Sequence, residues 1–205
     1  MIMPRSYHTM SAFKDSVVIT GGSPDGVAPP NNEIEIFNGT TWTKLNKTLT
    51  SPRIHHCAVV ISETEFYVLG GQSDKITTLS IMEKYNIDGN LVAGNLANMT
   101  IARSKFGCAL LDGKIYAAGG GSDGTSMTTM EVYDPLKDTW TRVAGQLGIF
   151  GTLSNHLVML NGKLVSYGQS VFSYDAEGEN WTQIEEANKG GNAYFALVVV
   201  PCSED

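Results

Sequence analysis

Short apolar runs alternate with polar, glycine-rich turns along the whole chain. A representative pair is residues 55–61 (HHCAVVI) and 66–69 (FYVL), which are separated by the polar turn SETE. No segment of about 11 residues or longer shows the 3.6-residue apolar period of an amphipathic helix. Short apolar runs bounded by turn residues are typical of strands. The pattern therefore predicts an all-β chain.

The apolar runs belong to a repeat. Gly-Gly follows an apolar run at Gly21, Gly70 and Gly119, at intervals of 49 residues (70 − 21 and 119 − 70). One further interval leads to Gly168, where the apolar run persists but Gln169 replaces the second glycine. Periods of 20–50 residues are typical of solenoids and propellers. The sequence therefore contains four copies of one unit.

Each copy has the same internal order of four predicted strands, A to D. Strand B ends at the glycines, and strand C is short and ends at an aromatic residue. Asp112-Gly113 and Asn161-Gly162 between strands A and B are typical of tight hairpins. Four antiparallel strands per copy, with a glycine and aromatic motif in each, are typical of a propeller blade. Strand D opens with Trp42, Leu91, Trp140 and Trp181 in the successive copies.

The third copy resembles the kelch repeat at every motif position: Arg103, Gly119, Gly120, Glu131, Tyr133, Asp134, Pro135 and Trp140. The other copies depart from it. Phe37 replaces the tyrosine in the first, Leu91 replaces the tryptophan in the second, and the fourth lacks the arginine, the second glycine and the glutamate. The resemblance covers nearly the whole chain and implies a kelch-type β-propeller.

The four copies divide a single domain, residues 1–205, into blades at about 3–48, 49–98, 99–147 and 148–187. A lone apolar segment, residues 193–201 (AYFALVVVP), follows and is predicted to be an extra strand. The first copy already has its own strand A, so this extra strand is not needed to complete it. We therefore expect an incomplete ring or a self-associating chain. A four-bladed ring with one spare strand is the alternative.

Residues that recur in most copies are expected to serve the blades themselves. Trp140 and its equivalents Trp42 and Trp181 should pack between neighbouring blades, with Tyr133 beside Trp140. Arg5, Arg53 and Arg103 should tie one blade to the next through hydrogen bonds to backbone or carboxylates. The glycines should allow close backbone approach or a positive φ. These glycines are Gly21, Gly22, Gly70, Gly71, Gly119, Gly120 and Gly168.

Charge and hydropathy narrow the choice of partners. The chain has 14 Lys and Arg against 21 Asp and Glu, for a net charge of −7, and contains no basic run. Nucleic acid is not expected as a partner, because phosphate binding needs clustered cations. No apolar stretch approaches the length that spans a bilayer, so a membrane is not expected either. A protein or peptide is therefore the expected partner.

The cysteines bear on the cellular compartment. Cys57, Cys108 and Cys202 form no CxxC pair. We expect free thiols, because the strand A segments of different blades are not hydrogen-bonded neighbours and a disulfide needs Cα atoms within about 7 Å. The chain is expected to be cytoplasmic. An extracellular chain is the alternative, since Asn-x-Thr occurs at Asn38, Asn46, Asn98 and Asn180.

No catalytic or metal-binding constellation is evident. Four histidines, His8, His55, His56 and His156, lie near the starts of strands A and would face a central channel if strand A is innermost, but the third copy has none in register. Kelch-type folds include enzymes such as copper oxidases, sugar epimerases and iron-dependent specifier proteins, but this sequence does not display the residue sets of the copper oxidases or the specifier proteins. We therefore predict no metal, no cofactor and no enzymatic activity.

The remaining candidate for function is the surface at one end of the blades. In a four-stranded meander, the B–C and D–A loops share one end, and binding residues tend to lie on loops that a rigid scaffold displays. The resemblance to BTB–kelch substrate receptors of ubiquitin ligases and to actin-associated kelch proteins implies that these loops grip a peptide, with arginines or serines meeting carboxylates. The alternative is an enzyme or carbohydrate-binding propeller that uses the channel mouth. The candidate contact residues are Arg5, Ser23, Asp25, Asn32, Arg53, His55, Gln72, Asp74, Lys75, Arg103, Lys105, Ser122 and Asp123.

Overall fold

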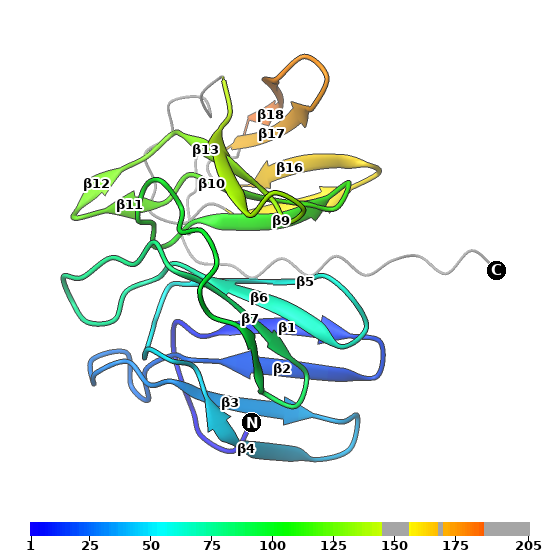
Figure 1. The fold of residues 1–205 in the computed structure, drawn as a ribbon. Coiled ribbons are helices and arrows are strands. Elements are labelled where there is room, and N and C mark those ends of the chain that lie inside the picture. Colours follow the sequence, from blue (N-terminus) through cyan, green and yellow to red (C-terminus); the bar gives the residue numbers. More distant parts are fainter. Residues whose placement is uncertain (145–155, 168–169, 187–205) are drawn as a thin grey trace.

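The computed structural model describes residues 1–144, 156–167 and 170–186, which form four antiparallel four-stranded sheets (Figure 1). The first sheet contains β1 (Thr9–Phe13), β2 (Ser16–Thr20), β3 (Glu33–Phe37) and β4 (Trp42–Thr48). The second contains β5 (Cys57–Val60), β6 (Glu65–Leu69), β7 (Met82–Asn86) and β8 (Leu91–Ala93). The third contains β9 (Gly107–Leu111), β10 (Lys114–Ala118), β13 (Met130–Asp134) and β14 (Thr139–Arg142). The fourth contains β15 (His156–Leu160), β16 (Lys163–Tyr167), β17 (Ser170–Asp175) and β18 (Asn180–Glu186).

Each sheet is one blade, and its strands pair in chain order, as the repeat predicts. A short hairpin of β11 (Gly121–Ser122) and β12 (Thr125–Ser126) extends the third blade between β10 and β13. The all-β, kelch-type prediction is confirmed. No helix in the described residues is long and apolar enough to cross a membrane. Gly168 and the predicted strand at 193–201 lie outside the described residues.

The blades lie side by side in chain order, because β1 contacts β5, β5 contacts β9, and β9 contacts β15. The first strand of each blade is therefore the innermost and the fourth is the outermost. In Figure 1 the first blade and the fourth blade lie at opposite ends of this row. Within the described residues, the four blades form an open row.

Apolar side chains fill the space between neighbouring blades. The core between the second and third blades includes Tyr67, Leu69, Ile115, Tyr133 and Trp140, all buried. The Trp140 indole Nε1 donates to the carbonyl of Ala97 from the second blade's exit segment at 3.0 Å. Its ring lies 5.3 Å from that of Tyr133, centroid to centroid. Trp140 therefore joins two blades, as the repeat predicts.

The repeated arginines share one geometry in successive blades. Arg53 is fully buried, and its guanidinium donates to the Gly70 carbonyl at 3.1 Å and to Glu83 at 2.7 Å within the second blade. Its own backbone carbonyl accepts a hydrogen bond of 2.9 Å from the Gly22 amide of the first blade. The Arg53 side chain thus stabilises the second blade, and the Arg53 carbonyl connects the second blade to the first. The prediction that the arginine side chains tie one blade to the next is therefore wrong: the guanidinium groups bond within their own blade, and the backbone carbonyls of Arg53 and Arg103 accept the hydrogen bonds from the preceding blade.

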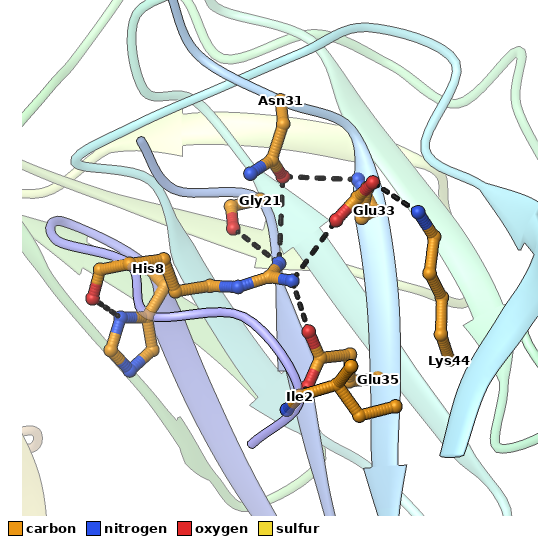
Figure 2. A network of polar contacts seen from close by, with 8 residues as sticks. Ile2, His8, Gly21, Asn31, Glu33, Glu35 and Lys44 are labelled. Carbon is orange, nitrogen blue, oxygen red and sulfur yellow. Dashed lines mark hydrogen bonds and ion pairs between the residues drawn. The ribbon is translucent and has the colours of Figure 1, made fainter. Parts of the chain in front are cut away.

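The same geometry explains why glycine is needed at the end of strand B. Gly70 has a φ of +61°, and a Cβ built there would lie 2.6 Å from the Arg103 carbonyl oxygen of the next blade. Any side chain would therefore push the two blades apart. Figure 2 shows the equivalent network in the first blade, where Gly21, Asn31, Glu33 and Glu35 surround the Arg5 guanidinium.

The expectation that the cysteines do not pair is wrong for two of them. Cys57 on β5 and Cys108 on β9 form a disulfide, with their Cα atoms 6.1 Å apart. The expectation considered only hydrogen-bonded neighbours. Innermost strands of adjacent blades also approach closely, and both side chains project into the apolar core between the second and third blades. Cys202 lies outside the described residues.

We expect Cys57→Ala/Cys108→Ala to lower the free energy of unfolding by about 2–4 kcal/mol, because the bond closes a long loop in the unfolded chain. The two cysteines are 51 residues apart. Urea unfolding of the oxidised protein, the reduced protein and the double variant measures the effect. Reduction should lower the stability of the wild type to that of the double variant and leave the variant unchanged. Equal stability of the oxidised and reduced wild type would contradict the prediction.

Candidate interaction face

The long loops gather at one end of the blades. In Figure 1 the loops after β2 and β6 and the β11–β12 hairpin project to the left, whereas the β1–β2, β3–β4 and β5–β6 turns lie to the right. We call the left end the loop face. It comprises residues 5–8, 23–32, 53–55, 72–78, 103–105 and 121–126.

Four of the predicted contact residues are not available to a partner. Arg5, Arg53, Arg103 and Ser23 are all buried. The Ser23 hydroxyl donates to the Ala28 carbonyl at 2.8 Å and so holds its own loop. The guanidinium groups are occupied by the blade framework described above. The resemblance implied that arginines bind a carboxylate of the partner. None of these three arginines is exposed, so they are not available for that contact.

Two aspartates shape the loops. The Asp25 carboxylate accepts hydrogen bonds from the Val27 and Ala28 amides at 2.8 and 2.6 Å. Asp74, one repeat later, accepts from the Ile76 and Thr77 amides at 2.8 and 2.6 Å. These backbone hydrogen bonds lower the pKa of both carboxyl groups. Both aspartates are exposed, but their first role is to cap a turn.

The remaining predicted residues lie on the loop face and stay accessible to different degrees. Lys75 and Asp123 are exposed, whereas Asn32, His55, Gln72, Lys105 and Ser122 are half-buried. The Asn32 side chain donates to the Leu49 carbonyl at 3.1 Å, and the Gln72 backbone pairs with Ile54. These two residues therefore contribute to the framework as well as to the surface.

The turns present aliphatic tips that sequence reasoning missed. Val27 and Ile76 are 72% and 80% exposed. Each stands two residues after a capping aspartate, so the 49-residue spacing could have identified them as equivalent positions. Apolar side chains held out on rigid turns are available for contact with an apolar partner surface.

A row of three side chains runs across the inner part of the loop face. Tyr7, His55 and Lys105 each stand two residues after a repeated arginine. The His55 amide donates to the Tyr7 carbonyl at 3.0 Å, and the Lys105 amide donates to the His55 carbonyl at 2.9 Å. The Tyr7 and His55 rings are 4.2 Å apart. We call these residues the axial row. Sequence reasoning missed Tyr7, although its position relative to Arg5 repeats in the next two copies.

The axial row carries one charge at neutral pH. Burial, and then the nearby Lys105 ammonium, lower the pKa of His55 to about 4, so its imidazole is neutral at pH 7. Lys105 makes no ion pair within the described residues. The row thus offers a phenol, a neutral imidazole and an ammonium group to a ligand.

The histidines do not gather around a metal position. His56 is buried, with its Nε2 2.8 Å from the Thr20 hydroxyl. The His8 Nδ1 lies 3.1 Å from the Arg5 carbonyl oxygen, and the His55 ring packs against Tyr7. In the part of the chain that the structure describes, no group of three or more His, Cys, Asp or Glu side chains is arranged to hold a metal ion.

Known proteins resemble the chain over nearly its full length. The model of the KLHDC2/KLHL20/DRC7 Kelch-repeats domain matches residues 7–200. F-box/kelch-repeat protein At4g39580 of Arabidopsis thaliana is 28% identical over 183 residues, which cover 83% of this chain and 46% of that protein. Alpha-scruin of Limulus polyphemus is 25% identical over 227 residues, 97% of this chain and 24% of that protein. The chain thus spans less than half the length of these curated relatives. It belongs to the kelch-repeat family.

Proposed function

We propose that the chain is a non-catalytic interaction module whose loop face binds a peptide segment of a partner protein. Kelch-repeat domains are in general protein-interaction modules, and relatives with kelch-repeat names include Kelch-like protein 33 of Homo sapiens, 30% identical over 104 residues, 48% of this chain and 19% of that protein. The observation that carries the proposal for this chain is the axial row.

The backbone of the axial row is one that glycine would adopt more easily. Tyr7, His55 and Lys105 have φ values of 60°, 55° and 56°. A non-glycine residue in this left-handed region costs about 1–2 kcal/mol. The inter-blade hydrogen bonds use only the amide and carbonyl groups, which glycine also has. The framework therefore does not require these side chains, and a role in binding accounts for them.

The chemistry of the face suggests what it binds. Tyr7, Val27 and Ile76 offer apolar contact, and Lys105 with the neutral His55 offers hydrogen bonds and one positive charge. A peptide with an apolar or aromatic residue next to a single carboxylate fits this set. A strongly acidic peptide fits poorly, because Asp25, Asp74 and Asp123 lie on the same face.

We expect Tyr7→Gly/His55→Gly/Lys105→Gly to abolish peptide binding while changing the free energy of unfolding by about 1 kcal/mol or less per site, since lost strain and gained chain entropy oppose each other. Peptides selected from a random phage-displayed library on the immobilised wild-type domain serve as the probe. Their affinities are then measured for wild type and variant by fluorescence anisotropy, with urea unfolding in parallel.

A matched control makes the same backbone change at the other end of the blades. Asp112 and Asn161 also have positive φ values, both 50°, and lie in exposed A–B turns. Asp112→Gly/Asn161→Gly should retain all peptide binding. Selected peptides that bind the triple variant as tightly as the wild type would refute the loop-face assignment.

Self-association is a second part of the proposal and involves a different surface. On the side of the first blade that no other described blade covers, Met10 is 57% exposed and Ala12 is exposed, with Phe37 and Trp42 half-buried beside the same face. The corresponding side of the third blade is covered by the second. We expect this chain to elute as a dimer or larger species in size exclusion with light scattering. Met10→Glu should shift it toward monomer, and a wild-type monomer of 22.1 kDa would contradict the expectation.

A further inference from the structure

We propose that this chain matures in an oxidising secretory compartment, where Cys57 and Cys108 are joined and N-linked glycans are attached at Asn38, Asn46 and Asn98, leaving the loop face bare. Two independent sets of residues support this inference. One lies on the innermost strands, and the other on the outer parts of the blades. The inference does not rest on the proposed peptide-binding function.

The first set is the disulfide. Cys57 and Cys108 meet in the apolar core between the second and third blades. Their Cα separation of 6.1 Å lies in the ordinary range for disulfides, so the two blades need no movement to accommodate the bond. Structural disulfides persist in oxidising compartments and are rare in cytosolic proteins.

The second set is the Asn-x-Thr sequence at four places. Asn38, Asn46, Asn98 and Asn180 are all exposed. Composition alone yields about two Asn-x-Ser or Asn-x-Thr sequences by chance in a chain like this one. Exposure is also common for asparagine. The main evidence for glycosylation is therefore the position of each Asn-x-Thr sequence in the fold.

All four acceptor residues are exposed, and none belongs to the loop face. Asn38 follows β3 in the turn toward β4, Asn46 lies on the outermost strand β4, and Asn180 begins the outermost strand β18. Asn98 adjoins Ala97, whose amide donates to Asp138 in the β13–β14 turn at 2.9 Å. A glycan at any of them would extend into solvent without covering the axial row or the aliphatic tips.

Local hydrogen bonds favour three of the four sites. The Asn38 Oδ1 accepts from the Thr40 and Thr41 amides at 3.1 and 2.9 Å, so its Nδ2, the atom that carries a glycan, is left without a bond inside the described chain. The Nδ2 atoms of Asn46 and Asn98 likewise make no hydrogen bond within the described residues. In contrast, the Asn180 Nδ2 donates to the Gly178 carbonyl at 3.3 Å. We therefore assign glycans to Asn38, Asn46 and Asn98.

Both modifications need a co-reactant that this compartment supplies. The disulfide of an oxidoreductase takes two electrons and two protons from the Cys57 and Cys108 thiols and is reduced to a dithiol as the Cys57–Cys108 S–S bond forms. A lipid-pyrophosphate-linked oligosaccharide donates the sugar. Its anomeric carbon forms a bond to the asparagine Nδ2, the bond from that carbon to the pyrophosphate oxygen breaks, the lipid pyrophosphate leaves, and the Nδ2 proton passes to a base.

Mass spectrometry of the protein isolated from its native source tests whether the Cys57–Cys108 disulfide and the three glycans are present. Free thiols are alkylated before reduction, and glycans are removed with an N-glycosidase in ¹⁸O-labelled water, which converts each occupied asparagine to labelled aspartate. We expect label at Asn38, Asn46 and Asn98, and protection of Cys57 and Cys108 from the first alkylation. Unlabelled asparagine at all three sites, or alkylated Cys57 and Cys108, would overturn the proposal.

Variants secreted from eukaryotic cells identify the individual sites. Asn38→Gln, Asn46→Gln and Asn98→Gln should each increase gel mobility by one glycan step, and Thr40→Ala or Thr48→Ala should reproduce the shift without changing the asparagine. Asn95→Gln is the matched control, because Asn95 is exposed but has Ala97 two residues later. A shift that Asn95→Gln also shows, or that Thr40→Ala and Thr48→Ala both fail to reproduce, would contradict the assignment.

Discussion

Replacing Arg103 with leucine is expected to lower the free energy of unfolding by about 3–5 kcal/mol, because the change leaves a buried carboxylate without its partner. Arg103 and Glu131 both have fully buried side chains, and their charged groups are 2.8 Å apart. The same guanidinium donates to the Gly119 and Thr129 carbonyls at 3.0 and 2.8 Å. Leucine would fill part of the space and satisfy none of these acceptors. Urea unfolding followed by tryptophan fluorescence measures the loss.

Two controls separate the buried charge from a general effect of substitution. Arg103→Leu/Glu131→Leu should be more stable than Arg103→Leu alone, because it leaves no unpaired charge in the core. Lys137→Ala removes one partner of an exposed pair, Lys137–Asp134, and should change stability by about 0.5 kcal/mol or less. A double variant that is less stable than Arg103→Leu would show that the unpaired carboxylate is not the source of the loss.

Trp140→Ala is expected to destabilise the chain by about 3–5 kcal/mol, the usual cost of removing a large buried aromatic side chain. Trp140 packs on Tyr133 at a centroid distance of 5.3 Å and donates to Ala97 of the neighbouring blade at 3.0 Å. The substitution would open a cavity between the second and third blades and leave the Ala97 carbonyl without its donor. The midpoint of urea unfolding, together with peptide affinity in the folded range, measures both stability and any effect on binding.

Trp42 is the matched control, since it occupies the same repeat position in the first blade. It packs against Phe37 at 5.1 Å but is half-buried, because no preceding blade covers that side within the described residues. Trp42→Ala should cost about 1–2 kcal/mol, in proportion to the smaller apolar area that it buries. Equal costs for Trp42→Ala and Trp140→Ala would mean that the ring packs within its own blade and does not join two blades.

The two predictions test different parts of one framework. Trp140 and Tyr133 join the second and third blades near the tight-turn end, whereas the Arg103 side chain holds the third blade together near the loop face through hydrogen bonds to backbone and carboxylate. The loop-face residues adjoin these hydrogen bonds of Arg103. Loss of Arg103 should therefore disturb peptide binding at urea concentrations that leave the fold intact, and loss of Trp140 should not.

The sequence alone determined the fold, because the same order of apolar runs, glycines and aromatic residues recurs in successive copies of the repeat. Gly21, Gly70 and Gly119 recur at 49-residue intervals, and at Gly21 and Gly70 the backbone of the next blade comes too close for a side chain. The recurrence of tryptophan at the start of the fourth strand in most copies placed Trp140, with Tyr133 beside it, at the blade boundary. Local spacing and hydrophobic pattern carry this information directly.

Only the tertiary structure decided which residues are surface and which are framework. Arg53 and Lys105 both stand in loops between blades and look equally available in the sequence. Burial of Arg53 against Glu83 depends on a contact 30 residues away, and the Cys57–Cys108 bond depends on two strands 51 residues apart. The row of Tyr7, His55 and Lys105 likewise exists because three separate loops meet beside the innermost strands. Contacts between distant segments follow from how whole blades pack, and no local pattern of residues encodes them.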